Sequence, residues 1–71
     1  MTRALTDRQK SILDYIKGFI AKHGFPPTRR EIASYFDFTS MNAAQQHLVA
    51  LQSKGKIMLT RDVSRGIKVV E

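Results

Sequence analysis

The stretch that decides the fold spans residues 28 to 48 and reads TRREIASYFDFTSMNAAQQHL. Its first residues, Thr28 and Glu31, have the spacing of a capping box, in which a hydroxyl and an acidic side chain satisfy free N–H groups at a helix start. The side of this helix that we expect to face inward is apolar and consists of Ile32, Ala33 and Phe36. The pattern predicts a helix of about two turns that ends before Asp37.

A tight turn and a second helix follow within the same stretch. Asp37 tolerates turn and left-handed backbone geometry better than most residues, and we expect Phe38 to fill the corner between the helices. Thr39 or Ser40 caps the next helix, which we expect to run to about Ser53. Helical rotation of about 100° per residue places Ala44, Leu48 and Leu51 inward, with His47 beside them, and places Asn42, Gln45, Gln46, Val49 and Ser53 outward.

The segment that precedes this helix pair predicts another helix. Thr6 and Gln9 form a second capping box, and Gly24 stands where a left-handed residue would end the helix. Pro27 disfavours helical geometry at Pro26, so the connection to residue 28 is extended. The apolar residues recur at three- and four-residue spacing, with Tyr15 at their border, and are Ile12, Leu13, Ile16, Phe19 and Ile20.

After Gly55 the apolar period changes from that of a helix to that of a strand. Ile57 and Leu59 alternate with polar or exposed positions, as Ile67 and Val69 do, and the polar segment 61–65 lies between the two runs. This pattern predicts a two-stranded hairpin. The expected fold is mainly α with a small antiparallel β-hairpin, a three-helix winged helix-turn-helix, in one domain over residues 1–71.

The composition of the chain narrows the classes of function that it can have. Twelve Lys and Arg against six Asp and Glu give a net charge of +6 in 71 residues, and the pI of 10.2 is typical of a nucleic-acid-binding domain. Cysteine is absent, which excludes disulfides and thiolate chemistry and suits a reducing cytoplasm. No run reaches the roughly 18–20 apolar residues of a membrane span, and no signal peptide is evident.

The sequence gives no reason to expect an enzyme. Its carboxylates are scattered, and His23 and His47 have no evident catalytic partner, so we interpret both histidines as structural. A chain this short leaves little volume for a buried pocket. We therefore expect no cofactor, no metal, no membrane association and no small-molecule ligand, and we place the function on the surface.

The second helix of a helix-turn-helix enters the major groove, and its N-terminal residues contact base edges. Here those positions carry uncharged polar side chains that both donate and accept hydrogen bonds, together with one small residue. Asn and Gln pair with adenine, Ser reaches several bases, and a methyl group contacts thymine. The predicted base-reading residues are Ser40, Asn42, Ala43, Gln45 and Gln46.

Phosphate contacts would hold the register on DNA. Arg29 and Arg30 follow Thr28 at a helix start, whose N–H groups favour an anion, and we do not expect both arginines to face one partner. Arg61 and Arg65 flank the wing tip. The predicted backbone and wing contacts are Arg8, Thr28, Arg29, Arg30, Lys54, Arg61, Ser64 and Arg65.

Two rival functions remain open. A winged helix that serves only protein–protein contact would show an exposed apolar patch, for which Met41, Val49 and Met58 are candidates, and would lack salt-dependent DNA affinity. RNA binding is a weaker alternative, because the core is expected to take up most of the four Phe and two Tyr residues and no stacking platform remains.

Taken together, several motifs make the chain resemble the N-terminal DNA-binding domain of the LexA repressors over nearly its whole length. The matching segments are Thr6…Arg8-Gln9, Gly24-Phe25-Pro26-Pro27-Thr28-Arg29…Glu31-Ile32-Ala33, Asn42-Ala43-Ala44…His47-Leu48…Ala50-Leu51…Lys54-Gly55…Ile57 and Ser64-Arg65-Gly66-Ile67. The resemblance implies a repressor of the SOS type that binds palindromic operators as a two-fold dimer. By position it assigns base contacts to the same five residues and supporting contacts to Arg8, Thr28, Arg29, Ser64 and Arg65.

The sequence also departs from that family. Met41 replaces a common proline, Asp37 stands where glycine is common in the turn, and Gln45-Gln46 replace a glutamate pair. Glu accepts from cytosine, whereas Gln prefers adenine and also donates, so we predict an operator shifted from the usual SOS box. No counterpart of the self-cleaving Ser–Lys peptidase domain of LexA occurs in this sequence, and we expect no enzyme activity from it.

Overall fold

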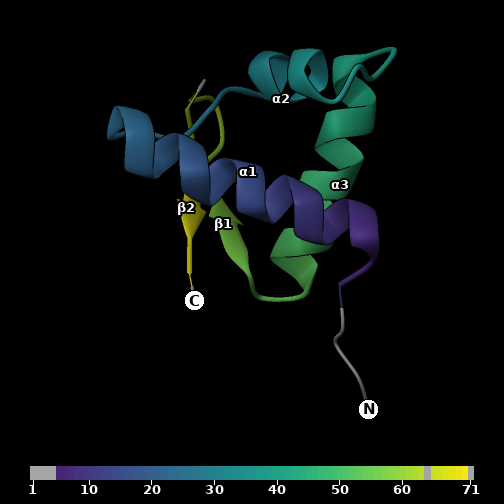
Figure 1. The fold of residues 1–71 in the computed structure, drawn as a ribbon. Helices are drawn as coiled ribbons and strands as arrows, with labels where there is room; N and C mark the ends of the chain where they lie inside the picture. Colours follow the sequence, from purple (N-terminus) through teal and green to yellow (C-terminus); the bar gives the residue numbers. More distant parts are fainter. Residues whose placement is uncertain (1–4, 64, 71) are drawn as a thin grey trace.

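A computed structural model describes residues 5–63 and 65–70 (Figure 1). Its elements in chain order are α1 (Asp7–His23), α2 (Arg29–Tyr35), α3 (Met41–Ser53), β1 (Ile57–Leu59) and β2 (Ile67–Val69). In Figure 1, α1 crosses the front of the molecule, α2 lies above it, α3 runs along the right side and the hairpin lies at the lower left. The predicted fold, three helices followed by an antiparallel hairpin, is confirmed.

The helix starts follow the capping chemistry that the sequence predicts. The Thr6 hydroxyl accepts from Gln9 N at 3.1 Å, and Gln9 Oε1 accepts from Thr6 N at 3.1 Å. The same reciprocal pair forms between Thr28 and Glu31 at 3.0 and 2.8 Å. Of the two candidate caps for α3, Ser40 is the one used, and its Oγ accepts from Ala43 N. All three helix starts are therefore fixed by their own local side chains.

The turn between α2 and α3 depends on a left-handed residue. Asp37 has φ 58°, and the chain closes with hydrogen bonds from Asp37 N to Ser34 O at 3.3 Å and from Phe38 N to Ala33 O at 2.8 Å. A short acidic side chain reaches this backbone region more readily than most. This turn directs the chain from α2 into α3 within a few residues.

One apolar core joins all five elements. The residues that the sequence analysis placed inward on α3 are confirmed, since Ala44, Leu48 and Leu51 are fully buried. Phe19, Ile20 and Phe36, also expected inward, are only half-buried. The rings of Phe19 and Phe36 belong to an aromatic cluster at the edge of the core. The buried apolar residues are Ile12, Leu13, Ile16, Ile32, Ala33, Ala44, Leu48, Leu51, Ile57 and Ile67.

The hairpin is the wing of the fold, and its geometry requires a glycine. β1 and β2 pair antiparallel, with Leu59 opposite Ile67, and Thr60 N donates to Gly66 O at 2.7 Å just beyond them. A Cβ on Gly66 would lie 2.6 Å from the Thr60 carbonyl oxygen, closer than carbon and oxygen can approach. The hairpin is also tied to α3, because Leu59 N donates to Gln52 Oε1 at 2.8 Å.

Candidate nucleic-acid interface

The predicted base-reading residues lie along one uncovered strip, at the N-cap and in the first two turns of α3. Ser40, Asn42 and Gln46 are exposed, and Ala43 and Gln45 are half-buried. Ala44, within the same run, is fully buried and turns the opposite side of the helix to the core. The strip therefore faces away from the apolar interior. We call Ser40, Asn42, Ala43, Gln45 and Gln46 the α3 strip.

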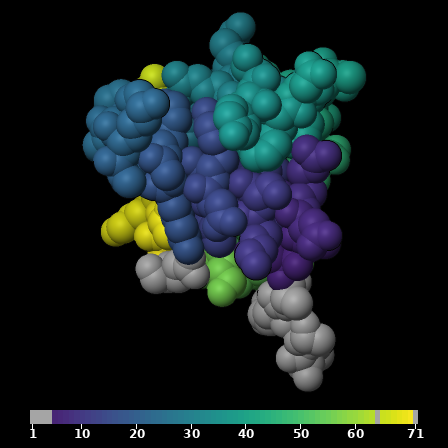
Figure 2. Space-filling model, in the orientation of Figure 1, coloured from purple at the N-terminus to yellow at the C-terminus, as the bar shows by residue number. Residues whose placement is uncertain are grey.

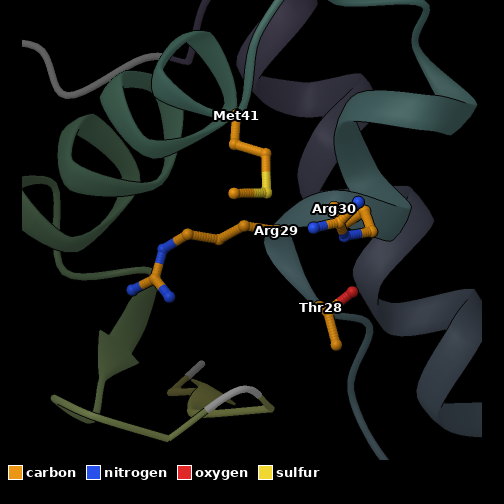
Figure 3. A pocket seen from close by; sticks show the side chains of 4 residues that line it. All are labelled: Thr28, Arg29, Arg30 and Met41. Carbon is orange, nitrogen blue, oxygen red and sulfur yellow. The ribbon is translucent and has the colours of Figure 1, made fainter.

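Next to the α3 strip, an open hollow of about 350 Å³ is lined by Thr28, Arg29, Arg30 and Met41. Figure 3 shows Arg29 reaching from the start of α2 toward α3, with the Met41 side chain pointing toward it. The Arg30 side chain does not follow Arg29 in this direction and stays beside the start of α2, in agreement with the expectation that the two arginines do not share one partner. Figure 2, which views the molecule from the side of α1, shows the teal segment of α2 and of the turn into α3 at the upper surface.

Arg29 is joined directly to the α3 strip. Its Nε donates a hydrogen bond to Gln45 Oε1, across sixteen positions of sequence. The two terminal nitrogens of the Arg29 guanidinium take no further partner among the described residues. One arginine thus links the start of α2 to a predicted base-reading side chain and keeps donors available for an anion.

Three more of the predicted phosphate-binding arginines are exposed, namely Arg8, Arg30 and Arg61. The Arg8 guanidinium lies 5.8 Å from the Phe36 ring centre and 5.5 Å from that of Phe38. Such cation–π contact is worth only about 0.5–1 kcal/mol at an exposed site. It leaves the N–H donors of Arg8 available for a phosphate.

The other two predicted cations have partners inside the domain. Lys54 Nζ donates to Gln9 Oε1 at 2.6 Å. Arg65 forms a two-pronged ion pair with Glu31, with Nη1–Oε1 at 2.8 Å and Nη2–Oε2 at 3.1 Å, and its Nη1 also donates to Pro26 O at 2.8 Å. Arg65 therefore faces the body of the domain in this structure instead of reaching outward from the wing. Ser64, the remaining wing residue of the prediction, lies outside the described residues.

Glu31 is the residue whose wider role the sequence analysis missed. Its carboxylate accepts from Thr28 N at the start of α2 and from Arg65, two residues before β2. The hydrogen bond from Arg65, and then the backbone N–H of Thr28, lower the pKa of Glu31. The capping box identified Glu31, but no local signal identified its partner 34 positions away.

Within residues 5–63 and 65–70, no three His, Cys, Asp or Glu side chains come together in a way that would hold a metal ion. Among these same residues, no helix combines the length and apolar character that crossing a membrane requires.

A helix pair with a tight turn, a following two-stranded wing and an uncovered polar strip on the second helix define a winged helix-turn-helix domain. Residues 2–66 match the family model described as the LexA DNA binding domain. The chain belongs to this family.

Named relatives agree with the family match. The chain is 54% identical over 69 residues to the LexA repressor of Colwellia psychrerythraea, with 97% of this chain and 33% of that protein covered. The same identity and length relate it to the LexA repressor of Bordetella avium, of which 32% is covered. It is 55% identical over 65 residues to the LexA repressor of Cupriavidus taiwanensis, with 92% and 30% covered. The chain thus spans about a third of the length of these relatives.

Proposed function

We propose that this domain binds double-stranded DNA at a specific sequence, as part of a LexA-like transcriptional repressor of the DNA-damage response. The α3 strip would lie in the major groove. One observation carries the proposal: Ser40, Asn42 and Gln46 are exposed at the N-terminal end of the second helix of the motif, which is the part that meets base edges in this docking mode.

The chemistry of the strip suits base reading. Asn42 and Gln46 carry amides that match the N6 and N7 pattern of adenine, and Ser40 can donate or accept. Ala43 has a methyl group that suits contact with thymine, and its small side chain allows the helix to approach the groove closely. We propose these four residues and Gln45 as the base contacts.

The phosphate contacts that we propose are Arg8, Arg29, Arg30 and Arg61, with Thr28 beside them. Arg29 and Arg30 line the hollow next to the strip, and Arg61 is exposed near the wing turn. The net charge of +6 would draw the domain toward DNA before any specific contact forms. Lys54 and Arg65 are left out of this set because the Lys54 ammonium is bonded to Gln9 and both terminal nitrogens of Arg65 are bonded to Glu31. Arg29 stays in the set because only its Nε is bonded, to Gln45.

We further propose that two copies bind a palindromic operator, in the cytoplasm. A single module of this kind buries only about 600–1,000 Å² on DNA, and two copies on one duplex would double that contact. A two-fold arrangement predicts half-sites separated by about one helical turn or a multiple of it.

Selection from random duplex DNA at two salt concentrations tests this function. We expect an enriched palindrome, weaker binding at higher salt, and loss of enrichment in a variant that combines Asn42→Ala with Gln46→Ala. Circular dichroism of that variant checks that the fold is retained. A retained fold with no enrichment by the unmodified domain would overturn the proposal.

One observation favours the rival function of protein–protein contact. Met41, Val49 and Met58, the candidates for an apolar patch, are 48%, 45% and 58% exposed. Selection separates the two cases, because a protein-contact module would give neither a consensus sequence nor a dependence of DNA affinity on salt.

A further inference from the structure

We infer that Arg29 sets the base preference of Gln45, so that Gln45 reads a hydrogen-bond acceptor, on guanine or thymine, in preference to adenine. The inference rests on the proposed function, since it requires that the α3 strip meets DNA. It departs from the expectation that glutamine at this position selects adenine. The reason lies in the contact between the two side chains.

The contact fixes which end of the Gln45 amide is free. An arginine N–H can only donate, because the guanidinium has no acceptor. The atom of Gln45 that faces Arg29 Nε must therefore be the amide oxygen, and Oε1 is the atom found there. Flipping the amide would set two donors against each other, so the orientation follows from chemistry as well as from the coordinates.

With its oxygen held, Gln45 offers the groove mainly its two N–H donors. The second lone pair of Oε1 lies beside a cation, and a base N–H brought to it would place another positive hydrogen next to the guanidinium. Guanine presents two acceptors in the major groove, N7 and O6, and thymine presents O4. Adenine sets its N6 donor beside N7, and recognition of both atoms needs an amide with a free oxygen and a free nitrogen.

Gln46 provides an internal comparison. It is exposed, and its amide has no hydrogen-bond partner among the described residues, so both the donor and the acceptor remain available. Two adjacent glutamines on one helix should therefore prefer different bases. We assign adenine to Gln46, and guanine or thymine to Gln45.

Selection with a small set of variants tests the inference. Gln45→Ala identifies the base pair that Gln45 contacts, because preference there relaxes, and Gln46→Ala identifies the other. At the first position we expect the unmodified domain to favour guanine or thymine over adenine by about fivefold or more. Arg29→Ala should release the amide oxygen and raise adenine at that position alone.

Arg30→Ala is the matched control. It removes the same charge from the next residue, which lines the same hollow but makes no hydrogen bond to Gln45. Both arginine variants should bind more weakly, whereas only Arg29→Ala should change the preferred base. As a second readout, Gln45→Glu keeps an oxygen for Arg29 and offers only acceptors, so it should favour cytosine, whose N4 donates.

The outcomes separate the two proposals. Absence of any enriched sequence would contradict the proposed function. An enriched operator with adenine at the Gln45 position, or a preference that Arg29→Ala leaves unchanged, would overturn this inference and leave the proposed function standing.

Discussion

The salt dependence of DNA binding tests which cations meet phosphate. The sequence nominates six, namely Arg8, Arg29, Arg30, Lys54, Arg61 and Arg65. Three of them have hydrogen-bond partners within the domain, namely Arg29 on Gln45, Lys54 on Gln9 and Arg65 on Glu31. Arg29 is bonded only through its Nε and keeps its two terminal nitrogens for a phosphate, so we exclude only Lys54 and Arg65. The structure therefore predicts that one domain on one half-site neutralises four phosphates.

Four and six neutralised phosphates predict clearly different salt dependences of DNA binding. Each neutralised phosphate contributes about 0.9 to the slope of log affinity against log salt, so four give about 3.6 and six give about 5.4. Raising salt from about 50 to about 200 mM should then weaken binding by about 150-fold for four contacts and by about 1,800-fold for six. Fluorescence anisotropy with a labelled half-site duplex resolves this difference.

Single substitutions show which residues contribute to the slope. Arg30→Gln and Arg61→Gln should each lower the slope by about 0.9, because both side chains are exposed. Lys54→Gln should leave it near its original value, because Lys54 is held by Gln9. A slope near 5.4 in the unmodified domain would refute the reasoning, since Lys54 and Arg65 would then have left their partners for DNA.

Three further predictions concern stability. Leu48→Ala should unfold much of the protein at 25 °C, as measured by circular dichroism. Leu48 is fully buried, so its truncation should lower the free energy of unfolding by about 2–5 kcal/mol. A core this small supplies only about 3–5 kcal/mol. Asp37→Val should lower the free energy of unfolding in urea by about 1–2 kcal/mol, because φ is 58° there and branched residues resist left-handed geometry; an unchanged urea midpoint would contradict this. Since Arg65 and Thr28 lower the pKa of Glu31, the wild type should lose stability as pH falls below the ordinary glutamate pKa of about 4.3 and through the lowered value. The Glu31→Gln variant should lose less stability over that interval. An equal fall in the free energy of unfolding of both proteins, measured in urea at each pH, would count against the ion pair.

The helices and the hairpin could be predicted because their signals are local. Thr6, Thr28 and Ser40 each cap a helix by accepting a hydrogen bond from the backbone N–H three residues further on. The change in the spacing of apolar residues marks the strands. The burial of Phe19 and Phe36 was overestimated for a related reason. Helical spacing gives the side of a helix that faces inward, but it does not show how completely the neighbouring elements cover that side.

The α3 strip was predictable in the same way, since rotation along one helix places Ala44 inward and Gln46 outward. Which of the cations have partners within the domain could not be predicted. Lys54 meets Gln9 across 45 positions and Arg65 meets Glu31 across 34, and no pattern in the sequence brings these residues together. A list of basic residues therefore does not show which of these charges already have partners within the domain.

The contact between Glu31 and Arg65 shows why such partners matter for the interface. Glu31 uses its carboxylate to cap the start of α2, which carries Arg29, and to hold Arg65 at the base of β2. The Arg65 guanidinium is further supported by Pro26 O and by the Phe25 ring, 4.5 Å away. The wing is thereby fastened to the helix-turn-helix before any DNA is present, and the loss of conformational freedom on binding is smaller than for a loose wing. An arginine that looks like a phosphate ligand in the sequence instead fixes the position from which its neighbours, Arg61 among them, would meet the duplex.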